Sequence, residues 1–423
     1  MFENGVVGKS VLRVDGKAKV LGQSQYATDL ELPGALYLKV LRSEVAHAVV
    51  KGIDVSEAMK IPGVVRIFTY VDIPGSNGYG IIIKDQPVLT DRVRFIGDAV
   101  ALVAAETLVA AEQALKAIRL DLEELRPVYD IWSALADNAP SIHDKGNILS
   151  VNHIRKGDAE LALKQAEVVV KQRYTTQRVE HAYIETEAGA AYLDNDILVI
   201  KAGTQNPHYD RRDVAQVLGL PMNRVRIVQT TTGGGFGGKL DISVQCFLGL
   251  AALKLGRPVK IAFDRRESFM ATAKRHPFII DYTSAASKEG KLLAAKVVIA
   301  GDTGAYASYG PATLNRAAVH ATGPYEVPNV EIEARCIYTN NPFSGAMRGF
   351  GTPQVAFAVE SQMDLLAQAL GISPLEIRRR NVLQPGSVTA TGQKLMNSVG
   401  ISKTLEAAWQ KALQVMPGLE GEN

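Results

Sequence analysis

The sequence predicts an α+β protein of two domains, and three features support this prediction. Its 423 residues are enough for two or three domains of ordinary size. Short β-like runs alternate with turns over the first part of the chain, before polar stretches that contain proline. A unit of strand, glycine loop, helix and strand follows in the second part, which indicates mixed sheets with packed helices. We expect the two domains to cover residues 1–130 and 131–423.

The first predicted domain is a compact α/β unit. Apolar runs at residues 64–68 and 99–103 each follow a turn that contains glycine, so both are predicted strands. Residues 107–118 are rich in alanine and carry apolar side chains at helical spacing, which predicts a helix. The polar stretches that end at Pro127 and Pro140 then indicate a domain boundary.

The second predicted domain opens with strands and a well-marked helix. Residues 168–174 and 197–200 are β-branched and apolar, as strands are. Asn206 fits the N-cap of a helix and Pro207 its first position. The apolar face of that helix ends at Gly219, a residue typical of a helix C-terminus.

The first glycine loop follows the next predicted strand. Residues 225–228 form this strand and lead into the loop at residues 233–239. A helix is expected over residues 241–255, ended by Gly256, and a strand over residues 259–263. Loop, helix and strand together would form one supersecondary unit.

The second glycine loop, at residues 348–354, is expected to lead directly into a helix. Thr352 is its expected N-cap, and its apolar pattern runs to residue 370. A capping box at Ser373 opens the next helix. A last helix is predicted over residues 403–415, before Pro417 and Gly418.

Charge and cysteine content exclude several classes of function. The net charge of +3 predicts neither a nucleic-acid partner nor a membrane surface. No apolar run approaches the roughly 18 residues that a membrane span requires. Cys246 and Cys336 are too few for a disulfide scaffold, a cysteine-ligated iron–sulfur cluster or a cysteine-rich zinc site. Residues 1–5 show no secretory signal, so we expect a cytoplasmic location.

The two glycine loops are the features that most directly indicate function. Such loops bring backbone N–H groups close to an anion, so two of them predict a large, phosphate-bearing cofactor. The first loop fits G-x-G-x-x-G, with Asp264 near the acidic position of a dinucleotide fold. It nearly fits a P-loop as well, but Leu240 replaces the magnesium-binding hydroxyl. A nucleotide-binding module and a turn made for close packing therefore both stay open.

The second loop adds side chains with a clear chemical use. Arg348 can form a two-pronged hydrogen bond with a cofactor oxygen or an oxyanion. Phe350, between two glycines, can present its ring face to a planar ligand. The plainer interpretation is a surface arginine beside a buried phenylalanine.

Both loops resemble motifs of the molybdenum hydroxylases, the family of xanthine dehydrogenases and aldehyde oxidases. The matching segments are residues 232–239 (Thr-Gly-Gly-Gly-Phe-Gly-Gly-Lys) and residues 346–354 (Ala-Met-Arg-Gly-Phe-Gly-Thr-Pro-Gln). Further matches lie at residues 14–19, 26–29, 42–48, 97–100, 275–278 and 374–381. The resemblance implies an N-terminal α/β-hammerhead domain, followed by the first molybdopterin-binding domain of the family.

The resemblance also implies a cofactor and a reaction. The cofactor is molybdopterin, in the cytosine dinucleotide form, and its dithiolene holds the molybdenum, so no metal ligand is expected from this chain. The implied reaction is hydroxylation of an electron-poor carbon, in which a metal-bound hydroxide attacks and hydride passes to a sulfido or selenido ligand. Water supplies the oxygen.

Eight positions carry implied roles. Gln205 matches the glutamine that hydrogen-bonds the apical oxo ligand, and Arg348 and Phe350 match residues beside the metal and against the substrate ring. Arg316 matches an arginine that orients the substrate. The implied cofactor-lining residues are Gly235, Phe236 and Gly237, and Leu240 occupies a substrate position.

Two departures from the family pattern qualify the resemblance. Purine-oxidising members have a substrate-binding glutamate where this chain has Leu240, which counts against purine recognition by that carboxylate. Typical members also continue well beyond residue 423. The wording of the motifs is most similar to the split, nicotinate-oxidising members. We therefore expect a second molybdopterin subunit that carries the catalytic glutamate, together with a [2Fe-2S] subunit and an FAD subunit.

The expected function is hydroxylation of an N-heteroaromatic substrate, nicotinate-like or a purine. An aldehyde- or CO-oxidising member, a nucleotide-binding module and a non-catalytic scaffold for the pterin are the alternatives. Glu185 and Glu187 form a candidate acid–base pair that would share one face of a strand. His181 and His208 are expected to be structural, and residues 378–380 (Arg-Arg-Arg) to form an exposed helix face that touches a partner subunit.

Overall fold

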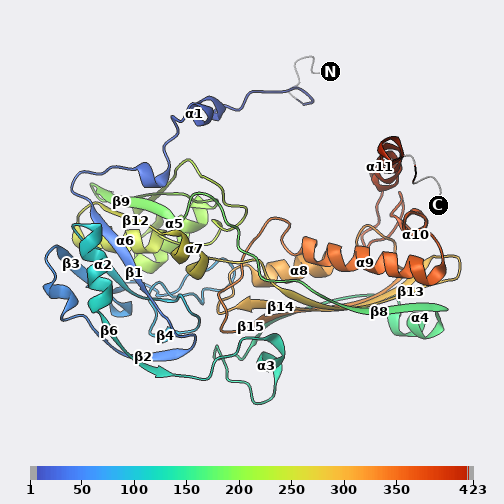
Figure 1. Ribbon diagram of the computed structural model, residues 1–423, viewed down its shortest axis with the longest axis horizontal. Helices are drawn as coiled ribbons and strands as arrows, with labels where there is room; N and C mark the ends of the chain where they lie inside the picture. Colours follow the sequence, from blue (N-terminus) through green and yellow to red (C-terminus); the bar gives the residue numbers. More distant parts are fainter. Residues whose placement is uncertain (1–6, 417, 419–423) are drawn as a thin grey trace.

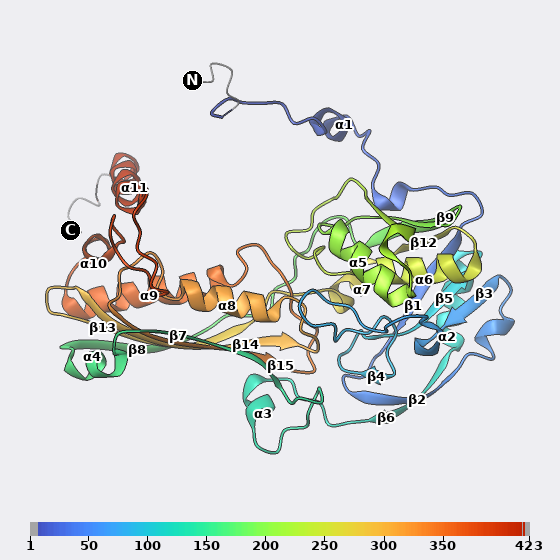
Figure 2. The ribbon, with the colours of Figure 1, turned by 180° about the vertical axis from the view of Figure 1, so that it is seen from behind.

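Three β-sheets organise the chain, and the α+β prediction is confirmed (Figures 1 and 2). The computed structural model describes residues 7–416 and residue 418. Pro417, which we expected beyond the last helix, lies outside the described residues, as do the residues searched for a signal.

The largest sheet has seven strands, three from residues 36–105 and four from residues 188–262. Its order is β11-β10-β9-β12-β1-β5-β3. The strands are β1 (Leu36–Arg42), β3 (Val64–Phe68), β5 (Ala99–Ala105), β9 (Ala188–Asp194), β10 (Ile197–Ala202), β11 (Val225–Gln229) and β12 (Val259–Ala262). The parallel pair of β1 with β12 joins strands from both sides of residue 130. The division of the chain near residue 130 stays a prediction.

The second sheet has five strands, in the order β7-β15-β14-β13-β8. They are β7 (Ile148–Lys156), β8 (Val168–Thr175), β13 (Phe278–Ala286), β14 (Leu292–Gly304) and β15 (Asn329–Tyr338). A third sheet pairs β2 (Ala48–Asp54) with β4 (Arg92–Val93) and β6 (Arg119–Glu124). In the five-stranded sheet β14 and β15 run parallel, and the other neighbours are antiparallel.

Helices cover the sheets and form a large apolar core on each of the two larger ones. The helices are α1 (Gly16–Val20), α2 (Leu108–Ala117), α3 (Ile131–Leu135), α4 (Ala159–Gln165), α5 (Pro207–Leu218), α6 (Gln245–Leu255), α7 (Arg265–Ala271), α8 (Gly310–His320), α9 (Thr352–Leu370), α10 (Pro374–Asn381) and α11 (Ile401–Val415). Helices α5 and α6 share a core with the seven-stranded sheet. Helices α8 and α9 pack on the five-stranded sheet, and α4 lies on its other face (Figure 1).

Most predicted elements are found, with two corrections. Helix α6 begins at Gln245 instead of residue 241, because the Gln245 side chain accepts hydrogen bonds from the N–H groups of Ser243 and Val244 and holds them outside the helix. The first glycine loop therefore does not lead directly into a helix. The second loop does, but the N-cap of α9 is Gly351, in a left-handed conformation, and Thr352 is the first helical residue.

No helix of the described residues combines the length and the apolar character that a membrane span requires.

A buried tyrosine ties the two larger sheets together. The hydroxyl of Tyr306, which follows β14, donates to Asp98 at 2.7 Å, directly before β5. Tyr306 is fully buried and packs edge-on against Phe95 and Phe343. Burial raises the pKa of Asp98 to about 6.

Tyr306→Phe is expected to lower the free energy of unfolding by about 1–3 kcal/mol, because it leaves Asp98 buried without one of its donors. Urea denaturation would measure the change. Tyr70→Phe, at a partly exposed site, is the control and is expected to change stability by less than about 0.5 kcal/mol. Equal stability of Tyr306→Phe and the wild-type chain would show that this bond does not hold the sheets together.

Candidate functional site

The two glycine loops lie against each other at the junction of the two larger sheets. The first loop follows β11 of the seven-stranded sheet, and the second connects β15 of the five-stranded sheet to α9. The Arg348 N–H donates to the Phe236 carbonyl at 2.9 Å. A Cβ at Gly237 would lie 2.6 Å from the Ala346 carbonyl oxygen, so only glycine permits this approach. Segments distant in sequence thus form one site.

Gln205 precedes α5, and its side chain lies against the first loop, whose N–H groups orient it. Its Oε1 accepts hydrogen bonds from the N–H groups of Gly237, at 3.0 Å, and Lys239, at 3.3 Å. Its own N–H donates to the Lys239 carbonyl at 2.8 Å. Because both partners of Oε1 are donors, the side-chain Nε2 faces away from the loop, and it donates to no residue within 7–416. Gln205 is exposed, so a ligand can reach this donor.

Residues with strained backbone conformations are concentrated in and beside these loops. Four residues other than glycine with positive φ lie in or beside them: Phe236 (+52°), Phe350 (+53°), Ala182 (+51°) and Ser308 (+40°). Each such conformation costs on the order of 1–3 kcal/mol and persists only where the surroundings enforce it. Strain of this kind is typical of ligand-binding sites.

The other predicted site residues, which are Phe350, Arg348, Leu240 and Arg316, differ in their contacts and exposure. Phe350 packs edge-on against Tyr309, with ring centroids 5.7 Å apart, and the Tyr309 hydroxyl accepts a hydrogen bond from Asn206 at 3.2 Å. Phe350 is thereby linked to the residue after Gln205. Arg348 is exposed and Leu240 is half-buried. Arg316 is exposed on α8, a helix whose Thr313 and Ala317 lie beside Gly351 of the second loop.

A buried ion pair supports the first loop from behind. The Lys239 ammonium lies 2.7 Å from Glu185, and their side chains are 1% and 8% exposed. Glu185 also accepts hydrogen bonds from the N–H groups of Gly233, at 2.7 Å, and Ala27, at 3.3 Å. Since Lys239 is buried in this pair, it does not reach out toward a phosphate, as a P-loop lysine does.

Glu185 and Glu187 are not the strand pair that the sequence suggested. Both precede β9 in an irregular segment, and Glu187 accepts a hydrogen bond from the Tyr183 hydroxyl. The i, i+2 spacing of the two glutamates could not predict the ion pair of Glu185 with Lys239, because Lys239 lies far along the chain.

His181 is structural, as expected: its Nε2 lies 2.8 Å from the Ala346 carbonyl oxygen, and burial lowers its pKa. His208 is exposed in α5.

Two buried carboxyl groups near the loops were missed by the sequence analysis. Burial raises the pKa of Asp210 and the pKa of Asp241 to about 7 each. Asp210 accepts hydrogen bonds from Thr204 Oγ1 at 2.6 Å and Gln245 Nε2 at 3.2 Å, which fixes the segment that carries Gln205. Asp241 accepts from Ser308 Oγ at 2.7 Å.

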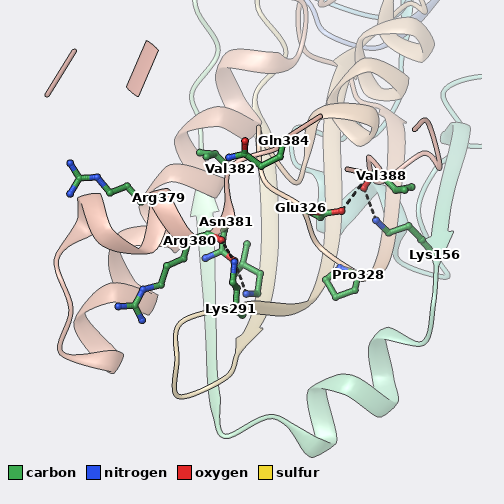
Figure 3. A pocket seen from close by; sticks show the side chains of 11 residues that line it. Lys156, Lys291, Glu326, Pro328, Arg379, Arg380, Asn381, Val382, Gln384 and Val388 are labelled. Carbon is green, nitrogen blue, oxygen red and sulfur yellow. Dashed lines mark hydrogen bonds between the residues drawn. The ribbon is translucent and has the colours of Figure 1, made fainter. Parts of the chain in front are cut away.

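A separate basic cavity of about 590 Å³ lies beside α10 (Figure 3). Lys156 in its wall donates to the Val388 carbonyl at 3.1 Å, and Arg379 forms a two-pronged pair with Glu406 of α11. Arg378 binds Glu360. The expectation that residues 378–380 form an exposed helix face is wrong, because all three arginines are half-buried and pair with acidic side chains from α9, α10 and α11. The contact of this face with a partner subunit stays a prediction.

Two family models match the chain. Residues 142–382 match the molybdopterin cofactor-binding domain, and residues 21–126 match the α/β-hammerhead domain of aldehyde oxidase and xanthine dehydrogenase. Together these models span the seven-stranded sheet, the five-stranded sheet and both glycine loops.

Relatives match the chain over nearly its whole length. The large molybdopterin subunit of nicotinate dehydrogenase from Eubacterium barkeri is 49% identical, over 97% of each chain. A probable xanthine dehydrogenase subunit from Bacillus subtilis is 42% identical, over 94% of this chain and 54% of that protein. The solved aldehyde oxidoreductase from Desulfovibrio desulfuricans has a TM-score of 0.93 at 30% identity, over 97% of this chain and 48% of that one. The chain thus spans about half the length of several relatives.

Lys239→Met is expected to lower the free energy of unfolding by about 3–5 kcal/mol, because it leaves the Glu185 carboxylate buried without its cation. Chemical denaturation would measure the change. Lys60→Met, which removes an exposed lysine paired with Glu57, is the matched control and is expected to cost less than about 1 kcal/mol. A Lys239→Met chain of wild-type stability would exclude a structural role for the pair.

Proposed function

The chain belongs to the aldehyde oxidase and xanthine dehydrogenase family of molybdenum hydroxylases, and we propose that it is the large molybdopterin-binding chain of a split enzyme. The proposed reaction is hydroxylation of an N-heteroaromatic ring, nicotinate-like in preference to a purine, with water as the source of oxygen. The observation that carries this proposal is the pair of interlocked loops around the oriented amide of Gln205.

The residues present fit a molybdopterin cofactor. The N–H groups of Gly234 and Phe236, on either side of the buried Gly235, donate no hydrogen bond to any residue that the structure describes, so they can bind an oxygen-rich ligand. The Nε2 of Gln205 and the guanidinium of Arg348 add further donors on the same exposed face. When bound, the cofactor supplies the redox and oxygen-transfer chemistry. The proposal includes its cytosine dinucleotide form.

The substrate follows from the second loop and from Leu240. Phe350 is proposed to stack against the planar ring and Arg316 to bind its carboxylate. An apolar Leu240 offers no hydrogen bond to a purine edge, which favours a simpler ring acid. The nicotinate dehydrogenase subunit, similar over 97% of its length, supports the same substrate class.

Partner chains complete the proposed enzyme. Gln205, Phe236 and Arg348 are all exposed, so the chain presents one open wall of a site. A second molybdopterin chain is proposed to supply the catalytic glutamate, and [2Fe-2S] and FAD subunits to remove the electrons. We place this assembly in the cytoplasm.

An aldehyde- or CO-oxidising activity is the second candidate, favoured by the likeness to a solved aldehyde oxidoreductase. Arg316 distinguishes it from the proposed activity, since a neutral aldehyde has no carboxylate to bind.

Gln205→Ala, in the assembled enzyme, is expected to lower kcat by about 10²–10³-fold while molybdenum content stays at the wild-type level, because one donor to the cofactor is lost. Metal analysis and steady-state rates would measure both quantities. Gln368→Ala, exposed on α9, is the control. Wild-type turnover by Gln205→Ala would refute the proposed site.

Arg316→Met is expected to reduce kcat/KM for nicotinate by roughly 10–100-fold, the loss of one charge-assisted hydrogen bond, and to spare a neutral heteroaromatic aldehyde. A substrate panel would measure the ratio of the two rates. Arg266→Met, exposed on α7, serves as the matched control. Equal losses for both substrates would contradict recognition of a carboxylate by Arg316.

A further inference from the structure

Residues 7–25 form an arm that leaves the body of the protein. Figures 1 and 2 show this segment, with the short helix α1, projecting from the side of the seven-stranded sheet into open space. Every hydrogen bond that these residues form among the described residues stays within the arm. None of the arm residues is buried. An extended segment that forms no hydrogen bond to the rest of the described residues is poorly explained as part of an isolated chain.

The arm is apolar and basic at once. Its large apolar side chains are strongly exposed: Val7 (95%), Val11 (69%), Leu12 (94%), Val14 (102%), Val20 (84%) and Leu21 (55%). It carries four basic residues, Lys9, Arg13, Lys17 and Lys19, and one acidic residue, Asp15. Strongly exposed apolar side chains gathered in one short segment are typical of a binding segment. The excess positive charge indicates that the complementary surface is acidic at its edges.

The base of the arm is attached to the candidate site. Tyr26 forms a parallel bridge with Thr231, just before the first glycine loop. The Ala27 N–H donates to Glu185, the carboxylate that also binds Gly233 and Lys239. A cavity of about 520 Å³, lined by Tyr26, Glu185 and Gly233, lies at this junction. The arm therefore starts where the cofactor loop is held.

We propose that the arm docks on the second molybdopterin-binding polypeptide, in an apolar groove with an acidic rim. The docked arm would hold the two chains together at the site that they share. This inference rests on the split enzyme proposed above. The solved aldehyde oxidoreductase matches 97% of this chain, so most of the arm has a counterpart there, yet the match covers only 48% of that longer chain. The occupant is the polypeptide that corresponds to the remaining part.

The position of the arm favours this occupant over a second copy of the chain. Figures 1 and 2 show the arm and helix α11 projecting to the same side of the molecule from opposite ends. In the proposed complex the partner is seated between them and covers Gln205, Phe236 and Arg348, which are exposed in this chain. A second copy would bring the same half of the site again and leave it incomplete.

The test uses the full chain with the polypeptide of the same organism whose sequence matches the second half of the relatives. Hydrogen–deuterium exchange would follow the amides of residues 7–25 in the chain alone and in the purified complex. Protection of at least tenfold on complex formation is expected. The double variant Leu12→Asp, Val14→Asp is expected to weaken the complex at least tenfold in analytical ultracentrifugation. Its unfolding midpoint is expected to be that of the wild-type chain, since Leu12 and Val14 are almost fully exposed among the described residues.

Val71→Asp places the same charge on a side chain that is 73% exposed on the body, and it is expected to leave the complex unchanged. A wild-type complex with unprotected arm amides and no effect of the double variant would overturn the arm proposal alone. The absence of such a polypeptide, or of any complex with it, would overturn the arm proposal together with the split enzyme.

Discussion

The main-chain contact between the two glycine loops is the constraint on which the site depends. Because the Arg348 N–H is bonded to the Phe236 carbonyl, neither loop can move without the other. The absence of a side chain at Gly237 allows this approach, and the same residue gives its N–H to Gln205. One contact thus sets the spacing of the loops and the direction of the Gln205 amide. The positive φ angles of Phe236 and Phe350 are the local cost of holding both loops there.

That contact forms only if the two large sheets dock correctly. The loops belong to different sheets, so their alignment depends on buried links between the sheets, such as Tyr306 with Asp98. The Lys239–Glu185 pair then fixes the first loop to the body. An ion pair in this position is stable because backbone N–H groups satisfy the remaining capacity of the Glu185 carboxylate. Site geometry is therefore a property of the whole fold.

The sequence revealed the features that are local and missed those that are not. Helix α5 was placed from Asn206, Pro207 and Gly219, because caps and stops act within one turn. The start of α6 was misplaced because the Gln245 side chain competes for N–H groups, an effect that apolar periodicity does not record. The pairing of β1 with β12, and of Lys239 with Glu185, depends on contacts between distant segments. Gln205 was predicted as a site residue from the resemblance alone, and Arg348 from both its place in the second glycine loop and the resemblance.

The exposure of the site supports the proposed division of the catalytic region between two chains. Hydrogen bonds from Gln205 and Arg348 to a cofactor are weak where water competes for both partners, and they strengthen when water is excluded. A chain that presents Gln205 and Arg348 on an exposed face therefore positions both donors but leaves them in contact with water, which weakens their hydrogen bonds. A covering chain would supply that environment as well as a catalytic base, so association and activity would be coupled. An arm that begins beside the cofactor loop suits this coupling, since docking it would restrain the same Glu185 that holds the loop.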